Sequence, residues 1–153
     1  QWPAESDARR RLWENLCSHL FEKFKGNLFN EIADELYDGG ADEDILIPMF
    51  VDHDHLNSYF LKPKGIQAAK MVVGVINRLS PDIVYCPMLF PMSSLFLHYM
   101  TAEACFNCMQ ALLGANSKKP SLFFLTQTKV KTEASKYVLL DLAKKYTVSF
   151  SFC

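Results

Sequence analysis

The chain has 153 residues, of which 50% are hydrophobic, 13% aromatic and 22% charged, so it carries enough apolar surface for one folded domain and is not expected to be disordered. Its 16 Lys and Arg against 17 Asp and Glu give a net charge of −1, which argues against nucleic acid as a partner. The chain has five cysteines, an odd number spread over its length, which favours reduced thiols in the cytoplasm. The sequence contains no run of about 18 apolar residues, so no membrane span is predicted.

The first part of the chain has apolar residues at helical spacing. A broad apolar stripe with Trp13 beside it predicts an amphipathic helix over 3–24, and a shorter helix is predicted over 28–36. The members of the stripe are Leu12, Leu16, Leu20 and Phe24. Residues 41–62 have no sustained period and predict a long irregular connection, a kind of segment that is often functional in a compact domain.

Helical spacing resumes after Pro63. Apolar residues over 66–79 outline one helical face. The almost entirely apolar stretch 85–100 has its prolines confined to its start, where a helix tolerates them, and predicts a buried central helix. His98, near the end of that stretch, is expected to be a hydrogen-bonded core histidine.

Two more helices are predicted towards the end of the chain. Thr101 is a suitable N-cap for a helix that closes at 114–117, and a last helix is predicted over 123–146. Residues 148–153 alternate like a strand without a strand to pair with, so they are treated as a tail of unknown structure. The chain is therefore predicted to be all-α, with six or seven helices.

Two groups of potential metal ligands occur in the sequence. Cys105 and Cys108 form a CxxC inside a predicted helix, without a second pair of ligands, which favours packing as small hydrophobic residues. A second group in the 41–62 connection lacks the ligand spacing of zinc proteases and favours a solvated loop. Its members are Asp52, His53, Asp54 and His55. No metal or cofactor is therefore expected, and no glycine run predicts a nucleotide site.

The order of several motifs resembles the front half of a TBC domain. Arg9 lies four residues before Trp13, as in the N-terminal element of that family, and two later segments, 49–55 and 85–87, are similar to its IxxDxxR and YxQ motifs. The likeness is strongest to the skywalker-type branch, in which a TBC domain is joined to a TLDc domain. The resemblance implies a partial TBC-type helical domain over 1–147, with the remainder of the TBC domain and a TLDc domain in the full-length protein.

The resemblance also implies which residues occupy the catalytic positions. In an active TBC domain the arginine neutralises charge on the transferring phosphoryl group and the glutamine orients the attacking water. Here the motif aspartate is Asp52 and the motif tyrosine is Tyr85, but the arginine position holds His55 and the glutamine position holds Pro87. Imidazole lacks the five-donor fork of guanidinium and proline has no donor at all, so GTPase-activating chemistry is not expected.

By this resemblance the protein is expected to regulate Rab- or Arf-type small GTPases in vesicle and endosomal traffic, including synaptic vesicles. It is expected to act by binding the GTPase, a phosphoinositide membrane surface or both, as a cytoplasmic protein peripheral on vesicle or plasma membrane. Two alternatives remain. The first is an active GTPase-activating protein whose catalytic arginine and glutamine, called fingers here, come from elsewhere. The second is a helical protein-interaction module that is unrelated to GTPases and uses the 41–62 loop, with a metal at His53 and His55.

Overall fold

The computed structural model describes residues 7–20, 27–37, 45–118 and 129–147. The described residues form six α-helices and one short 3-10 helix, which confirms the all-α prediction. The elements are α1 (Asp7–Leu20), α2 (Leu28–Tyr37), η1 (His53–His55), α3 (Pro63–Leu79), α4 (Leu89–Phe96), α5 (Ala102–Lys118) and α6 (Lys129–Thr147). None of the helices in these ranges is long and apolar enough to cross a membrane.

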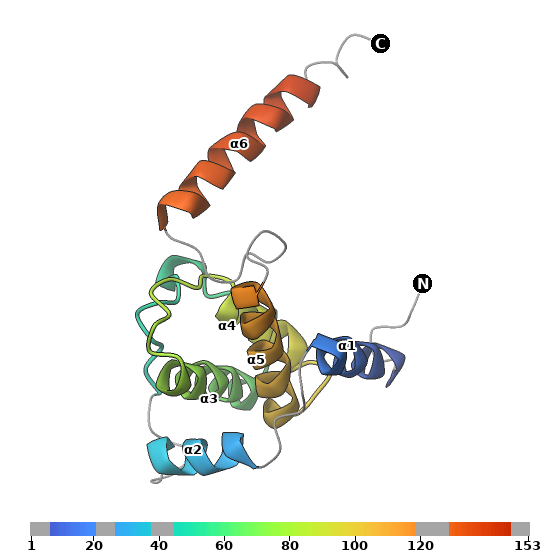
Figure 1. The fold of residues 1–153 in the computed structure, drawn as a ribbon, viewed down its shortest axis with the longest axis vertical. Coiled ribbons are helices and arrows are strands. Elements are labelled where there is room, and N and C mark those ends of the chain that lie inside the picture. The colour runs from blue at the N-terminus through green and yellow to red at the C-terminus, as the bar shows by residue number, and fades with distance from the viewer. Residues whose placement is uncertain (1–6, 21–26, 38–44, 119–128, 148–153) are drawn as a thin grey trace.

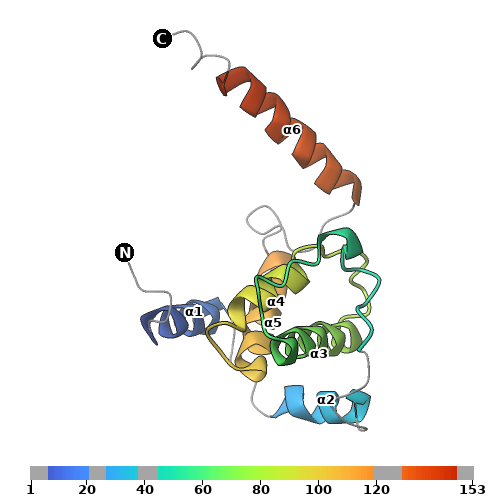
Figure 2. The ribbon, with the colours of Figure 1, turned by 180° about the vertical axis from the view of Figure 1, so that it is seen from behind.

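Helices α1 to α5 form a packed body and α6 projects from it (Figure 1). Helix α5 packs against α1, α2, α3 and α4, and α3 packs against α2 and α4, so α3 and α5 form the centre of the body. Seen from behind, α1 and α2 lie at the outside of this arrangement, and α6 again leads away from it (Figure 2).

The core lies between α3, α4 and α5. Helix α3 is buried almost around its circumference, since its buried residues include the unbroken run 72–76. Leu89 and Phe96 from α4 and Phe106 from α5 are buried against it. Each such side chain stabilises the fold by roughly 1.5–3 kcal/mol relative to full exposure. Helix α2 adds Phe29, whose ring centroid is 5.5 Å from that of Phe106.

The predicted start of α5 is confirmed, but its predicted end is not. The hydroxyl oxygen of Thr101 accepts a hydrogen bond from the backbone N–H of Ala104 at 3.3 Å, as an N-cap does. The helix continues through Gly114 as far as Lys118 instead of closing at 114–117. An isolated glycine costs a helix only about 1 kcal/mol relative to alanine, which does not by itself end it.

The prediction of one helix over 85–100 is wrong, because only residues 89–96 of that stretch form α4. The residue before a proline avoids helical backbone angles, and Cys86 precedes Pro87 and donates its N–H to the carbonyl of Phe50 instead of to a helical turn. His98 follows α4 in a turn and is exposed, so it is not a core residue. Its Nε2 lies 2.9 Å from the carbonyl oxygen of Tyr59.

Helix α1 faces the core through Trp13, which belongs to the broad apolar stripe predicted for this helix. Leu12 and Leu16 of the predicted stripe are exposed, whereas Trp13 packs with its ring centroid 4.9 Å from that of Phe96. Trp13 therefore links α1 to α4, in addition to the packing of α1 against α5.

Several predicted segments lie partly or wholly outside the described residues. They are 3–6 and 21–24 of the first helix, 41–44 of the connection, 123–128 of the last helix and the tail 148–153. The described remainder of the connection, 45–62, contains η1 as its helical element and is otherwise irregular, as predicted.

Candidate functional site

The two segments that resemble TBC motifs, 49–55 and 85–87, lie side by side and are called here the motif segments. The backbone N–H of Cys86 donates to the carbonyl oxygen of Phe50 at 2.8 Å, which links the middle of one segment to the start of the other. Phe50, Val51 and Cys86 are buried in the hydrophobic core. Burial on both sides of this hydrogen bond fixes the motif segments relative to each other and to α3.

Asp52 organises the local backbone of the first motif segment. It is the N-cap of η1, and its Oδ1 accepts a hydrogen bond from the backbone N–H of Asp54 at 3.1 Å. A short aspartate side chain is favoured at this position because it satisfies a donor that a helix leaves unpaired. His55 is the last residue of η1, and its side chain lies outside the described part of the structure. Asp52 thus caps the turn that ends at His55.

Tyr85 and Pro87 of the second motif segment are partly exposed. Burial of the phenol raises the pKa of Tyr85, and the Asp52 carboxylate raises the pKa further. The Tyr85 hydroxyl therefore stays protonated at physiological pH and is available as a hydrogen-bond donor. Pro87 provides neither a side-chain amide nor a backbone N–H, so this edge of the site has no donor at the glutamine position.

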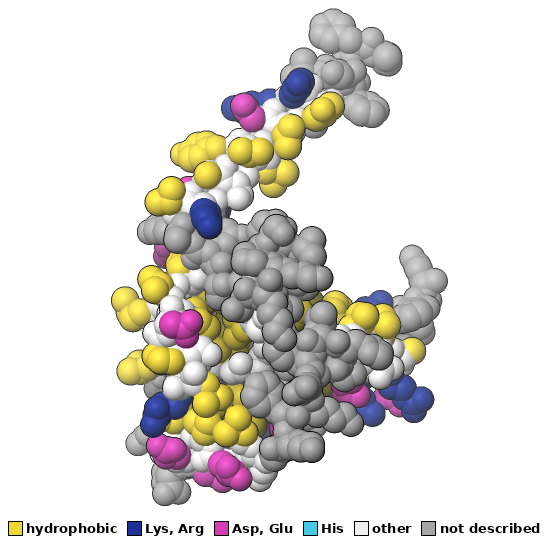
Figure 3. All heavy atoms as spheres, in the orientation of Figure 1, with side chains coloured by type: hydrophobic (Ala, Val, Ile, Leu, Met, Phe, Trp, Pro, Cys, Tyr) yellow, Lys and Arg dark blue, Asp and Glu magenta, His cyan; other side chains and the backbone are white. Residues whose placement is uncertain are grey.

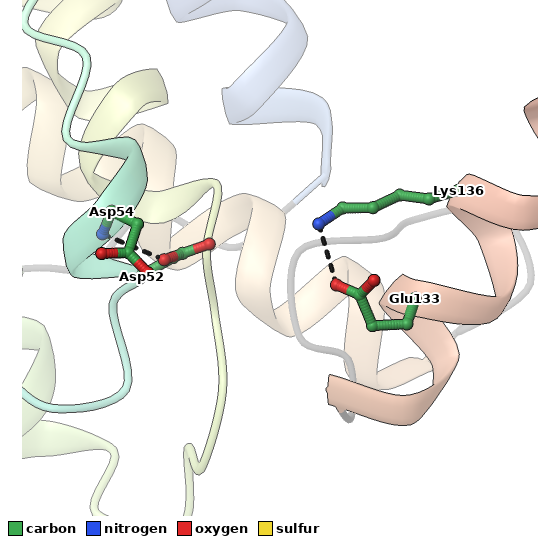
Figure 4. A network of polar contacts seen from close by, with 4 residues as sticks. All are labelled: Asp52, Asp54, Glu133 and Lys136. Atoms are coloured by element: carbon green, nitrogen blue, oxygen red, sulfur yellow. Dashed lines mark hydrogen bonds and ion pairs between the residues drawn. The ribbon is translucent and has the colours of Figure 1, made fainter.

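Two residues of α6, Lys136 and Glu133, complete the charged surroundings of the motif segments. Lys136 Nζ lies 2.8 Å from Glu133 Oε1. Figure 4 shows this ion pair on α6 and, separately, the contact between Asp52 and Asp54. The Lys136 ammonium lowers the pKa of Tyr85, while Asp52 raises the pKa of Lys136 after the larger effect of Glu133. Sequence reasoning missed both residues, because no local pattern links α6 to a motif more than forty residues earlier.

The N-terminal element, Arg9 and Trp13, lies at the other end of α4. Arg9 Nη1 donates to the Tyr99 hydroxyl at 3.3 Å, and the guanidinium carbon is 5.9 Å from the centroid of the Tyr99 ring. Trp13 contacts Phe96, the last residue of α4, while Pro87 precedes the helix. Since α4 has eight residues, it separates this element from Pro87 by about 12 Å. The structure therefore brings the motif segments together but places Arg9 and Trp13 apart from them.

The cysteines near the site are buried and show no sign of nucleophilic activation. Burial raises the pKa of the Cys86 thiol to about 12, so the thiol is uncharged at physiological pH. Cys105 and Cys108 are buried within α5, as expected of small hydrophobic residues, and Cys105 Sγ donates to the Ser93 carbonyl at 3.6 Å. Within the described ranges, no three His, Cys, Asp or Glu side chains are grouped closely enough to hold a metal ion.

Comparisons with known proteins agree with these motifs. Residues 7–148 match the model of the Rab-GTPase-TBC domain family. The chain is 31% identical to the GTPase-activating protein skywalker of Drosophila melanogaster over 97% of its own length, and 31% identical to TBC1 domain family member 24 of Xenopus tropicalis over 95%. It spans only about a quarter of each of these relatives, 25% and 26%.

Two solved structures have the same fold. The crystal structure of the Drosophila Skywalker TBC domain superposes with a TM-score of 0.80 at 32% identity, covering 97% of this chain and 48% of that one. A second crystal structure, of the same domain in complex with inositol(1,4,5)trisphosphate, gives a TM-score of 0.78 at 32% identity and is covered to 50%. The family match, the relatives and the shared fold all show that this chain belongs to the Rab-GTPase-TBC domain family.

Proposed function

We propose that this chain belongs to a TBC-type regulator that binds a Rab- or Arf-type small GTPase in vesicle or endosomal traffic without accelerating GTP hydrolysis. The observation that carries the proposal is the pairing of the two motif segments by the Cys86–Phe50 hydrogen bond, in a chain whose finger positions are His55 and Pro87. The scaffold that holds catalytic fingers in this family is thus present, while the finger chemistry is absent from both positions.

The size of the missing contribution supports binding without catalysis. An arginine finger supplies a factor of about 10³–10⁵, equivalent to roughly 4–7 kcal/mol of barrier lowering. Histidine is only partly protonated near neutral pH and cannot make the bidentate contact of a guanidinium. Proline at position 87 cannot hold the attacking water.

Lys136 does not reverse this argument. Its ammonium lowers the pKa of Tyr85, but it is already paired with Glu133 and lies on α6 instead of on a motif segment. The active GTPase-activating alternative therefore needs an arginine and a glutamine from positions other than 55 and 87. The interaction-module alternative unrelated to GTPases is disfavoured by membership of the TBC family.

A phosphoinositide headgroup is a second candidate ligand of the protein to which this chain belongs. The observation in its favour is the Skywalker TBC domain solved in complex with inositol(1,4,5)trisphosphate, a domain to which this chain is 32% identical. Binding to such a headgroup would hold the regulator at the surface of a vesicle or of the plasma membrane. We assign no residues of this chain to that contact.

Binding and catalysis are tested separately. A panel of Rab and Arf GTPases, loaded with GTP analogue or with GDP, is titrated against the chain in calorimetry. We expect at least one GTPase to bind its GTP-analogue form more tightly, and an Asp52→Ala variant to weaken that binding because η1 loses its cap. Exposed Lys144→Ala, at the far end of α6, is the control and should leave binding unchanged. If no GTPase in the panel binds in either nucleotide state, the proposal is wrong.

A further inference from the structure

The turn at residues 58–61 holds two aromatic residues in a backbone conformation that their side chains disfavour. The backbone N–H of Leu61 donates to the carbonyl oxygen of Ser58 at 3.1 Å and closes the turn. Its central residues, Tyr59 and Phe60, have φ angles of 49° and 61°. Two positive φ angles are typical of a type I′ turn, in which Asn, Asp and Gly normally occupy the central positions. Since a Cβ atom crowds the backbone in this conformation, other contacts have to hold it.

Hydrogen bonds on both sides of Tyr59 hold the turn in place. Its backbone N–H donates to Asn57 Oδ1 at 2.8 Å. Its carbonyl oxygen lies 2.9 Å from His98 Nε2, and because a carbonyl can only accept, the imidazole donates through that nitrogen. His98 follows α4, so this second bond joins the turn to the packed body. The turn is therefore fixed relative to the rest of the fold.

Phe60 is the side chain that this turn presents, and it is 100% exposed. Other hydrophobic side chains are exposed on α6 and on the body, as Figure 3 shows, so exposure alone does not identify a contact surface. Phe60 differs from them because its backbone is strained as well. An Asn or Gly at position 60 would relieve the strain without loss of packing, since the ring is fully exposed. Strained backbone concentrates at binding sites, which indicates a binding role for the ring.

The chain that follows the turn is positively charged. Residues 56–81 contain four Lys or Arg and no Asp or Glu, in a chain with a net charge of −1. Arg78 is paired with Glu35 of α2, but Lys62 and Lys64 are exposed two and four residues after Phe60. An exposed aromatic ring beside lysines is typical of a segment that lies on an anionic membrane, because the ring enters the acyl boundary and the ammonium groups stay among the headgroups. An apolar pocket of a partner protein would account for the ring, but not for the two lysines.

We propose that the turn at 58–61 inserts into the surface of an anionic lipid bilayer, with Phe60 at the acyl boundary and Lys62 and Lys64 facing the headgroups. Burial of one phenylalanine side chain favours binding by about ten- to a hundredfold, and each lysine adds about fivefold. These contributions give weak binding, which acts together with other membrane contacts of the protein. The contact is made by the turn itself and needs neither a GTPase nor a phosphoinositide headgroup.

Vesicle sedimentation tests the insertion. The chain is titrated with vesicles of phosphatidylcholine and phosphatidylserine that contain no phosphoinositide. We expect Phe60→Asn to lower the partition coefficient by about tenfold or more. The same change should raise the melting temperature by about 2 °C, because Asn adopts a positive φ more readily than Phe, so lost binding would not result from unfolding. Leu46→Asn is the matched control, since Leu46 is 85% exposed on the same connection but lies outside the turn, and it should leave binding unchanged.

Two further variants separate the roles of the lysines and the ring. Lys62→Gln combined with Lys64→Gln should weaken binding to these vesicles by about tenfold or more and leave binding to pure phosphatidylcholine unchanged. A Phe60→Trp variant should bind as the parent does. Its fluorescence should be quenched by lipids brominated on their acyl chains more strongly than that of the parent, because the indole enters the acyl boundary.

Four results would overturn the proposal. They are a parent chain that does not bind these vesicles, a Phe60→Asn variant that binds as well as the parent or melts below it, a Leu46→Asn variant that loses binding equally, and a Phe60→Trp variant that is quenched no more than the parent. Unchanged binding of Phe60→Asn would assign the exposed ring to a protein partner instead. The vesicles contain neither a GTPase nor a phosphoinositide, so the outcome is independent of the proposed function.

Discussion

At the contact between α2 and α3, one oxygen atom decides whether Gly74→Ala stabilises or destabilises the fold. A Cβ added at Gly74 would overlap the hydroxyl oxygen of Tyr37 and would lie 3.2 Å from its Cζ. Alanine gains about 1 kcal/mol over glycine in a helix interior, whereas overpacking costs roughly 1–3 kcal/mol. Because the hydroxyl is part of the α2–α3 contact and Gly74 is buried, we expect overpacking to outweigh helix propensity, and Gly74→Ala to destabilise the fold by about 1 kcal/mol.

The same change should stabilise the protein once the oxygen is removed. In a Tyr37→Phe background the ring carbon at 3.2 Å needs to give way by only a few tenths of an ångström, so helix propensity dominates and Gly74→Ala gains about 0.5 kcal/mol. Urea denaturation of the four proteins, followed by circular dichroism, gives the coupling free energy, which we expect to be about 1.5 kcal/mol. Equal effects of Gly74→Ala in the two backgrounds would refute this account of the helix contact.

Three further predictions concern local contacts and pH. Trp13→Ala should destabilise the protein by about 2 kcal/mol in urea denaturation, because its half-buried ring packs on Phe96; an effect as small as that of exposed Leu16→Ala would contradict this. Thr101→Ala should cost about 1 kcal/mol through loss of the α5 cap, while Thr101→Asn should retain most of the stability. Since burial raises the pKa of Cys86 from 9.0 to about 12, the folded state binds more protons between these values, and the free energy of unfolding should fall as pH rises from 9 towards 12. The slope from this thiol is at most about 1.4 kcal/mol per pH unit, and a Cys86→Ala variant with the same pH dependence as the parent would contradict it.

Features that depend on local chemistry were predictable from the sequence. The hydroxyl of Thr101 and the proline at position 63 mark helix starts through contacts within one turn, and the helices begin where these residues indicate. The apolar period of residues 66–79 indicates α3 because apolar residues at helical spacing form a face that is buried in the core. The family motifs were also readable, because they are short patterns in fixed order.

Features that depend on distant contacts were not predictable. The stretch 85–100 has the composition of one apolar helix, but Cys86 donates its backbone N–H to Phe50, and residues 85–88 are not helical. Leu12 and Leu16 have helical spacing but are exposed, whereas Trp13 beside them packs on Phe96. Spacing alone does not indicate which side of a helix finds a partner.

The candidate site also combines features that depend on local chemistry with features that depend on distant contacts. Asp52 and Tyr85 are assigned to motifs only through the family resemblance, and the Asp52 cap is local, since it spans two residues. The effect of Lys136 on the pKa of Tyr85 depends on where α6 lies relative to the body, which no pattern within α6 encodes. The charges around a site are thus set by tertiary structure even where the site's own residues are evident from their motifs.

Single-turnover GTP hydrolysis tests the absence of finger chemistry most directly. GTP-loaded Rab and Arf proteins that bind the chain are followed with and without an excess of it, and in parallel with a His55→Ala variant. We expect acceleration below about tenfold with both proteins, because neither His55 nor Pro87 can supply the finger chemistry. Acceleration well above tenfold that is lost in His55→Ala would contradict the account, since the imidazole would then be acting where an arginine normally does.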